Sequence, residues 1–312
     1  MQKQNSPRYS VVIPVFNEES NVETLIKEIK VSMKKVAGEY EIIVVNDGST
    51  DDTEKVLAKI ESVKIISLRR NFGQSTALDT GIKASVGEKI ITLDGDGQND
   101  PADFLKLIQK MEEGYEVVCG WRYQRKDSFD KRFISSVARN LRSILVDDTV
   151  HDAGCTLRVY KRDCFEDLDL SGEMHRMIPA ILRWRGFKIT EIIVNHRPRI
   201  AGVSKYGPSR MVKGFLDMLL IWFTRKYNSR PLHLFGGAGL FLILFSSVLL
   251  FTMAWMKIFF GYTLSDKIWP LVGLVGLLAG IQLLVSGILA DLVIKNNTQE
   301  KSWMIKKIIE NK

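Results

Sequence analysis

The chain has 312 residues and a net charge of +8 at neutral pH, with 46% hydrophobic and 26% charged residues. That length allows one large or two ordinary domains. The excess of basic over acidic residues favours nucleic acid, an anionic membrane or phosphorylated substrates as partners. Its three cysteines, Cys119, Cys155 and Cys164, have no CxxC spacing, which argues against a disulfide scaffold and a cysteine-based zinc site.

The first 200 residues alternate strand-like and helix-like patterns. Residues 1–9 lack the apolar stretch of a signal peptide, so the first domain is expected to stay in the cytoplasm. Strands are predicted at residues 9–14, 41–46, 63–68, 89–93 and 116–120, and helices at 20–36, 50–60, 73–84 and 101–112. Two later strands, near 156–160 and 189–195, could extend the sheet. This alternation predicts an α/β fold with a mostly parallel central sheet wrapped in helices.

The composition changes sharply near residue 230. Two apolar runs, at about 232–256 and 268–294, are each long enough to cross a hydrocarbon core of about 30 Å. They are separated by a predicted loop at 257–267. Small residues suited to close helix packing recur in both runs: Gly236, Gly237, Gly239, Gly273, Gly276 and Gly280. These faces permit a homo-oligomer.

Lysine and arginine flank the outer ends of the two runs. Arg225, Lys226 and Arg230 precede the first, and Lys295, Lys301, Lys306 and Lys307 follow the second, whereas the loop holds only Lys257 and Lys267. Both termini are therefore predicted to be cytoplasmic. Residues 208–227 mix basic and aromatic side chains, which predicts an amphipathic helix at the membrane surface, with a packed surface helix as the alternative. The predicted segments are a domain at 1–207, a juxtamembrane helix at 208–230, two transmembrane helices within 231–294 and a tail at 295–312.

An acidic, glycine-containing motif follows the strand at 89–93. It reads Asp94-Gly95-Asp96-Gly97-Gln98. Open α/β sheets bind ligands at the carboxyl ends of their strands, and glycines let the backbone approach a bulky ligand. Two carboxylates and an amide oxygen suit Mg²⁺ or Mn²⁺, cations that also bind phosphate oxygens.

Two further polar motifs follow earlier strands, at residues 14–19 and 46–52. Helix capping, by Ser20, Thr50 and Asp100, explains one polar residue in each turn. It does not explain why Glu18 and Asp47 share a sheet edge with the Asp94 motif, because like charges gathered at one site are costly unless a cation joins them. A metal-bound nucleotide fits this pattern.

The motifs at residues 12–18, 45–51 and 94–98 together resemble family-2 inverting glycosyltransferases of the GT-A fold. Their order and spacing match over the first 200 residues. The two carboxy-terminal spans extend the resemblance to polyprenyl-phosphate glycosyltransferases, the group of dolichol-phosphate mannose synthase and of bacterial enzymes that charge undecaprenyl phosphate. The resemblance then covers the whole chain and makes residues 1–207 a cytoplasmic GT-A domain.

The resemblance implies roles for residues at the donor side. Base and ribose would be lined by Pro14, Phe16, Asn17, Glu18 and Asp47. Mg²⁺ or Mn²⁺ on the diphosphate would be held by Asp94, Asp96 and Gln98. The donor would also be faced by Arg69, Asn71 and Gln74. Phe16 replaces a common tyrosine and Asn46 a common aspartate, so the identity of the nucleotide stays open.

Basic residues in the second half match the group's acceptor side. The candidates for gripping a lipid phosphate are Arg122, Lys131, Arg132, Ser135 and Arg199, with a solvated basic surface as the alternative. Arginine offers a planar donor fork to phosphate oxygens. Catalytic roles are predicted for Arg122, for Lys205, which would neutralise the leaving diphosphate, and for Asp152, which would position the acceptor or its proton. His151, His175 and His196 are isolated and are predicted to be structural or at the surface.

Other enzyme classes fit less well. The QxxRW signature of processive synthases is incomplete, because Ala180 stands where its glutamine would be, and Walker and GxGxxG signatures are absent. The sequence predicts metal-dependent, inverting transfer of one sugar from a UDP-sugar or GDP-mannose to undecaprenyl or dolichyl phosphate at the cytoplasmic membrane face, with no nucleic-acid partner. The alternatives are a non-phosphate lipid or glycan acceptor, and a non-catalytic nucleotide-sugar-binding scaffold.

Overall fold

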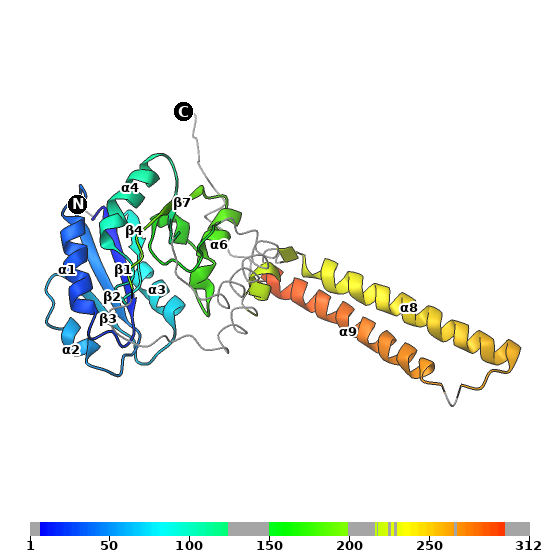
Figure 1. Ribbon diagram of the computed structural model, residues 1–312. Coiled ribbons are helices and arrows are strands. Elements are labelled where there is room, and N and C mark those ends of the chain that lie inside the picture. The colour runs from blue at the N-terminus through cyan, green and yellow to red at the C-terminus, as the bar shows by residue number, and fades with distance from the viewer. Residues whose placement is uncertain are drawn as a thin grey trace. The chain divides into compact units, whose positions relative to one another are not determined.

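The computed structural model describes residues 7–123, 150–198, 216, 218–223, 226–227, 230–264 and 267–296 (Figure 1). The chain divides between Leu219 and Leu220 into two compact units. The first is an α/β unit and the second contains a pair of long helices. Most of the predicted juxtamembrane helix and of the tail at 295–312 lie outside the described residues.

The α/β unit is built on a seven-stranded sheet of order β3-β2-β1-β4-β6-β5-β7. The strands are β1 Tyr9–Val15, β2 Tyr40–Asn46, β3 Lys64–Ser67, β4 Lys89–Thr92, β5 Val117–Trp121, β6 Arg158–Lys161 and β7 Ile189–Ile193. Strand β6 runs antiparallel to both of its neighbours, whereas the other described pairs are parallel. The predicted α/β fold with a mostly parallel sheet is confirmed. The two late strands differ in place, because β6 lies inside the sheet and only β7 extends its edge.

The helices of this unit are α1 Val22–Met33, α2 Thr53–Leu57, α3 Gln74–Lys83, α4 Phe104–Glu112 and α6 Ile178–Trp184. A 3-10 turn at Pro101–Asp103 leads into α4, and Asp100 caps it by accepting the Ala102 amide, as predicted. The predicted helix at 50–60 was too long. Thr50 donates its amide to the Asn17 side chain instead of beginning a helix, so α2 begins only after Asp52.

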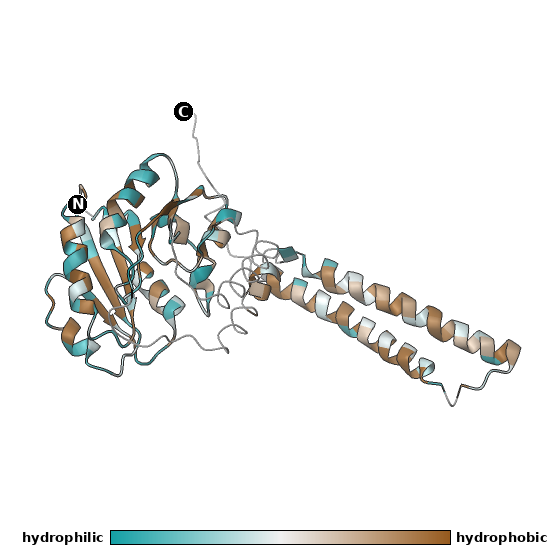
Figure 2. Cartoon of the chain, in the orientation of Figure 1, coloured by the Kyte–Doolittle hydropathy of each residue, from teal (hydrophilic) through white to brown (hydrophobic). Residues whose placement is uncertain are grey.

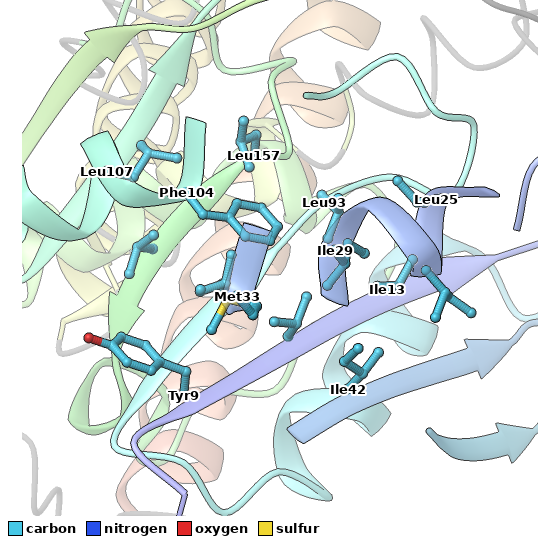
Figure 3. Packing of buried hydrophobic residues seen from close by; sticks show 14 of the residues in the cluster. Tyr9, Ile13, Leu25, Ile29, Met33, Ile42, Leu93, Phe104, Leu107 and Leu157 are labelled. Atoms are coloured by element: carbon cyan, nitrogen blue, oxygen red, sulfur yellow. The ribbon is translucent and has the colours of Figure 1, made fainter. Parts of the chain in front are cut away.

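Both faces of the sheet are covered by apolar residues. Figure 3 shows one core, in which β1 side chains pack against α1 and α4. Alternation along β1 explains the division, because Val11 and Ile13 enter this core and Val12 enters the core on the opposite face, where Leu78 of α3 and Leu182 of α6 lie. Apolar packing therefore covers both faces of the sheet, and loops form the edge at the carboxyl ends of its parallel strands.

The second unit contains α8 Pro231–Phe260 and α9 Trp269–Asn296, each long and apolar enough to cross a membrane. Figure 2 shows hydrophobic residues along most of both helices. At 1.5 Å per residue the 30 residues of α8 span about 45 Å. The loop predicted at 257–267 begins later in the structure, because α8 extends to Phe260. A single lysine does not end a helix, so α8 continues to Phe260 and ends at Gly261, whose φ of 65° is left-handed.

Glycines let α8 and α9 pack closely, as predicted. A Cβ on Gly239 would lie 2.7 Å from the carbonyl oxygen of Gly280, and a Cβ on Gly276 would lie 2.3 Å from Ser246 Oγ. Gly237 differs, because a Cβ there would meet nothing within 4 Å. Backbone contact at this distance is what small residues permit in helix pairs that lack a hydrophobic driving force.

Candidate active site

The loops that follow β1 and β2 are tied together at the carboxyl edge of the sheet. Asn17, at a left-handed φ of 54°, donates its amide to Ser49 Oγ at 2.9 Å, and its side-chain oxygen accepts the Thr50 amide at 2.8 Å. The Glu18 amide donates to Thr53 Oγ1 at 2.9 Å. Asn17 and Glu18 thus join two loops in the structure. Their predicted contact with the donor stays a prediction.

A cavity of about 420 Å³ opens beside these loops, a size that suits a small-molecule ligand. It is lined by the predicted donor residues Phe16, Arg69 and Asn71. Ser49, Leu68 and Arg70, which the sequence prediction left out, also line it. Glu54 also lines the cavity, so its carboxylate offsets one of the two arginine charges. The aromatic ring and the remaining positive charge suit a phosphorylated, ring-containing ligand.

Asp47 organises the loop that carries part of this lining. It is 3% exposed, and its two carboxylate oxygens accept the amides of Phe72 and Gly73 at 2.8 and 2.9 Å. Burial raises the pKa of Asp47, and the two amide donors oppose that rise. In the structure this carboxylate holds the segment before α3, a role that the sequence prediction did not foresee.

Asp94 and Asp96 follow β4, beside the end of β1. A Cβ on Gly95 would lie 2.6 Å from Val15 Cγ1 and 3.2 Å from the Pro14 carbonyl oxygen, so only glycine allows this approach. Gln74, the first residue of α3, donates its side-chain amide to Asp94 Oδ1 at 2.6 Å. The structure therefore brings together the predicted residues Pro14, Gln74, Asp94 and Asp96.

The two aspartates repel each other in a partly buried place. Burial, followed by the negative charge of Asp96, raises the pKa of Asp94, while the hydroxyl of Thr156 and the Arg122 guanidinium oppose the rise. The backbone amide of Gln98 donates to Asp96 Oδ1 at 3.1 Å, so the two residues belong to one turn. A hard divalent cation fits this set of two carboxylates and one amide oxygen. Within the described residues, no cluster of three His, Cys, Asp or Glu side chains with metal-binding geometry occurs.

Arg122 and Asp152 form a two-pronged ion pair at the end of β5. Arg122 Nε and Nη2 donate to the two carboxylate oxygens at 2.7 and 2.9 Å, and the Arg122 amide donates to Asp152 at 3.3 Å. Both side chains are nearly buried. The pair holds the guanidinium in one orientation. The predicted catalytic roles of these residues stay predictions. To accept a proton, Asp152 would have to give up a hydrogen bond from Arg122.

The remaining basic candidates, Lys131, Arg132, Ser135, Arg199 and Lys205, lie outside the described residues. Arg197, two residues before Arg199 in the sequence, forms ion pairs with Glu28 and Asp100, both at 2.7 Å. The three cysteines are buried free thiols, in line with the exclusion of a disulfide scaffold.

Two of the described histidines are held by neighbouring side chains. His151 stacks on the Trp121 ring at 4.4 Å and pairs with Glu191, and His175 is buried against Ser75. These contacts agree with the predicted structural or surface roles.

Two further residues near Asp94 were missed, Thr156 and Arg158. Both affect the pKa of Asp94. They come from a segment some sixty residues further along the chain, and no spacing rule connects it to the Asp94 motif. The sequence predicted a strand at 156–160 and a role for Asp152 just before it, but it assigned no role to these two residues.

Comparisons with known proteins show to which family the chain is similar. Residues 10–169 match the model of glycosyl transferase family 2. The chain is 36% identical over 293 residues to a dodecaprenyl-phosphate galacturonate synthase from Rhizobium johnstonii, covering 91% of this chain and 87% of the relative. It is 30% identical over 311 residues to an undecaprenyl-phosphate 4-deoxy-4-formamido-L-arabinose transferase from Proteus mirabilis, covering 97% and 94%.

Among solved structures, the fold resembles glucosyl-3-phosphoglycerate synthase from Mycobacterium tuberculosis, crystallised with Mn²⁺, UDP and glucosyl-3-phosphoglycerate. The TM-score is 0.55 at 21% identity, over 70% of this chain and 80% of that one. A likeness at this identity concerns the fold, and it supports the GT-A architecture of the α/β unit.

Proposed function

The chain belongs to glycosyl transferase family 2, and on that premise we propose that it transfers one sugar from a nucleotide sugar to a polyprenyl phosphate. The observation that carries the proposal is the length of the similarity. The two relatives named for polyprenyl-phosphate sugar transfer match almost end to end, through the α/β unit and the two apolar helices. A match confined to the α/β unit would have supported a glycosyltransferase with any acceptor.

The donor side is assigned to the cavity and the Asp94 turn. The nucleoside occupies the cavity lined by Phe16 and Arg69, and the diphosphate extends toward Asp94 and Asp96. These two aspartates and Gln98 would hold Mg²⁺ or Mn²⁺, which supplies positive charge to the leaving diphosphate when bound. Gln74 orients the Asp94 carboxylate through its 2.6 Å hydrogen bond, so that one oxygen keeps a fixed direction.

The acceptor side is assigned to Arg122 and to the basic candidates beyond the described residues. A lipid phosphate carries an anionic oxygen near neutral pH, so little general-base assistance is needed for its attack on the anomeric carbon. Attack from the face opposite the leaving diphosphate gives inversion. Asp152 accepts hydrogen bonds from Nε and Nη2 of Arg122 and thereby fixes the guanidinium, so that its remaining N–H groups would bind a phosphate without reorganising during the reaction.

The membrane helices solve a problem of proximity. A polyprenyl phosphate keeps its tail in the bilayer, and a chain anchored by α8 and α9 meets that phosphate at the membrane surface. The excess of lysine and arginine outside the two spans supports a cytoplasmic position for both ends and for the α/β unit.

The test is a transfer assay with the purified full-length protein in detergent. It uses undecaprenyl phosphate, Mn²⁺ and a panel of labelled UDP- and GDP-sugars, and it scores label that enters the organic phase. We expect label from one donor, lost with EDTA and in Asp96→Asn. The control is Asp169→Asn, which removes an exposed carboxylate paired with Lys83.

The outcomes separate the alternatives. Nucleotide-sugar binding without organic-phase label from any donor would overturn the polyprenyl-phosphate acceptor and favour a non-phosphate lipid, a glycan or a non-catalytic scaffold. Transfer that survives both EDTA and Asp96→Asn would overturn the metal assignment while leaving the reaction in place.

A further inference from the structure

Arg158 is a charged side chain enclosed in the protein. It begins β6, faces Thr92 of β4 in the sheet register and is 1% exposed. Within the described residues it has no carboxylate at ion-pair distance, and its Nε has no hydrogen-bond partner. Burying a guanidinium without a counter-ion is costly, and an apolar residue of similar volume would be cheaper at a purely structural position.

Two of the hydrogen bonds of Arg158 join separate loops, and a third runs from Nη1 to Tyr160 Oη at 3.3 Å within β6. Nη2 donates to the carbonyl oxygen of Ala153 at 2.7 Å, and Nη1 donates to the carbonyl oxygen of His175 at 3.0 Å. Ala153 precedes β6, whereas His175 belongs to the 3-10 turn Met174–Arg176. One planar group thus spans two backbone segments that no described strand pairing connects.

Each of these loops is connected to the candidate active site, the first along the chain and the second through hydrogen bonds. Ala153 is next to Asp152, which holds the Arg122 fork. The His175 amide donates to Ser75 Oγ at 3.1 Å, and His175 Nδ1 lies 2.8 Å from the same oxygen.

Ser75 in turn is next to Gln74, the residue that donates to Asp94. One hydrogen bond and one peptide unit therefore connect Arg158 to Asp152, and three hydrogen bonds, by way of His175, Ser75 and the adjacent Gln74, connect it to Asp94.

We propose that Arg158 is a positioning residue, which sets the Arg122–Asp152 pair and the Gln74–Asp94 pair at a fixed spacing through the Ala153 and His175 carbonyl oxygens. This role rests on the proposed glycosyl transfer. Arg158 does not touch a substrate, because its side chain is enclosed. The nucleotide cavity is lined by other residues, so binding of the nucleotide is largely independent of it.

The proposal predicts a separation of rate from nucleotide binding. In Arg158→Met, we expect kcat for sugar transfer to fall at least about tenfold, because misplacement by about 1 Å costs up to a hundredfold. The Kd for UDP or GDP without added metal, whichever the wild-type protein binds, depends on the cavity and not on Asp94, and it should change less than about threefold by titration calorimetry. Arg158→Lys keeps the charge but replaces two donor nitrogens by one, and it should recover part of the rate.

Arg162 provides a matched control on the same segment. Its Nε donates to the Gly87 carbonyl oxygen at 2.8 Å and its Nη2 to Ser85 Oγ at 3.2 Å, at the amino end of β4 and far from the Asp94 turn. Arg162→Met removes a similar pair of hydrogen bonds, one to a carbonyl oxygen and one to a hydroxyl. It should lower the melting temperature without changing kcat per nucleotide-binding site.

The rate is divided by the number of nucleotide sites titrated in each preparation, so that unfolded protein does not count. An unchanged kcat per site in Arg158→Met would overturn the proposal, and so would parallel losses of nucleotide affinity and rate. If Arg158→Met fails to fold, Arg158→Lys becomes the test. A wild-type kcat in Arg158→Lys would overturn the proposal that Arg158 acts through the carbonyl oxygens of Ala153 and His175. A wild-type protein that transfers nothing to polyprenyl phosphate refutes the proposed function and this role with it, whereas normal wild-type transfer with unimpaired variants refutes only the role of Arg158.

Discussion

Replacing Gly48 by alanine should damage the nucleotide cavity more than it damages the fold. Gly48 has a left-handed φ of 65°, and a Cβ there would lie 2.3 Å from the carbonyl carbon of Arg70 and 2.7 Å from the Asn71 nitrogen. Nonbonded carbon atoms prefer separations of about 3.5–4.0 Å. The backbone at Arg70 and Asn71 must therefore move by roughly 1.2 Å or more, and both residues line the cavity.

Two costs follow from this movement. The left-handed φ costs alanine about 1–2 kcal/mol in stability. Displacement of the lining removes polar contacts to the nucleotide, and two of them at about 1 kcal/mol each amount to about 2 kcal/mol. The Kd for the nucleotide should then rise about thirtyfold.

Titration calorimetry with UDP and GDP in the presence of Mn²⁺ measures the effect, and Gly186→Ala is the matched control. Gly186 has a φ of 90°, and a Cβ there would meet nothing within 4 Å, so its substitution adds backbone strain without a clash. We expect a lower melting temperature in both variants and weaker binding only in Gly48→Ala. Wild-type affinity in Gly48→Ala, or an equal loss in both, would refute the reasoning.

Three further substitutions test other parts of the structure. Asp152→Asn leaves a nearly buried guanidinium with a poorer partner and should lower stability by about 3 kcal/mol in denaturant unfolding, together with the transfer rate. Gly239→Ala forces a Cβ to within 2.7 Å of a carbonyl oxygen on α9 and should lower the melting temperature in detergent, whereas Gly237→Ala, which points into open space, should not. Phe104→Ala in the core should cost about 3–5 kcal/mol, against less than about 1 kcal/mol for the exposed neighbour in Leu105→Ala.

The fold and the location of the site were predictable because local patterns determine both. Apolar strand patterns that alternate with helical patterns along the chain indicated a parallel sheet, and the polar motifs at the carboxyl ends of β1, β2 and β4 had to meet at one edge. The Asp94 turn beside Pro14 is the direct result. The two apolar helices were recognisable from length and composition alone.

The finer arrangement depends on partners that are distant in sequence. Asp47 is bound by amides 25 and 26 residues further along, so its local motif could not show that it holds a loop. The position of β6 between β4 and β5 is set by tertiary packing, since chain order alone favours adding a late strand at the edge. Arg158 and Thr156 reach the Asp94 turn only through that insertion.

The insertion of β6 also explains how an acidic sheet edge is tolerated. Strand β6 and its preceding loop bring Asp152 and Arg158 to the neighbourhood of Asp94 and Asp96, and β5 brings Arg122. Three carboxylates against two guanidinium groups leave a single negative charge, so the edge is nearly balanced before any ligand arrives. A divalent cation alone would change this net charge from −1 to +1, and a nucleotide-sugar diphosphate bound with it, which carries two negative charges, would return it to −1. Under the proposed function, the metal and the nucleotide sugar would therefore bind together without changing the net charge that β5 and β6 set at this edge.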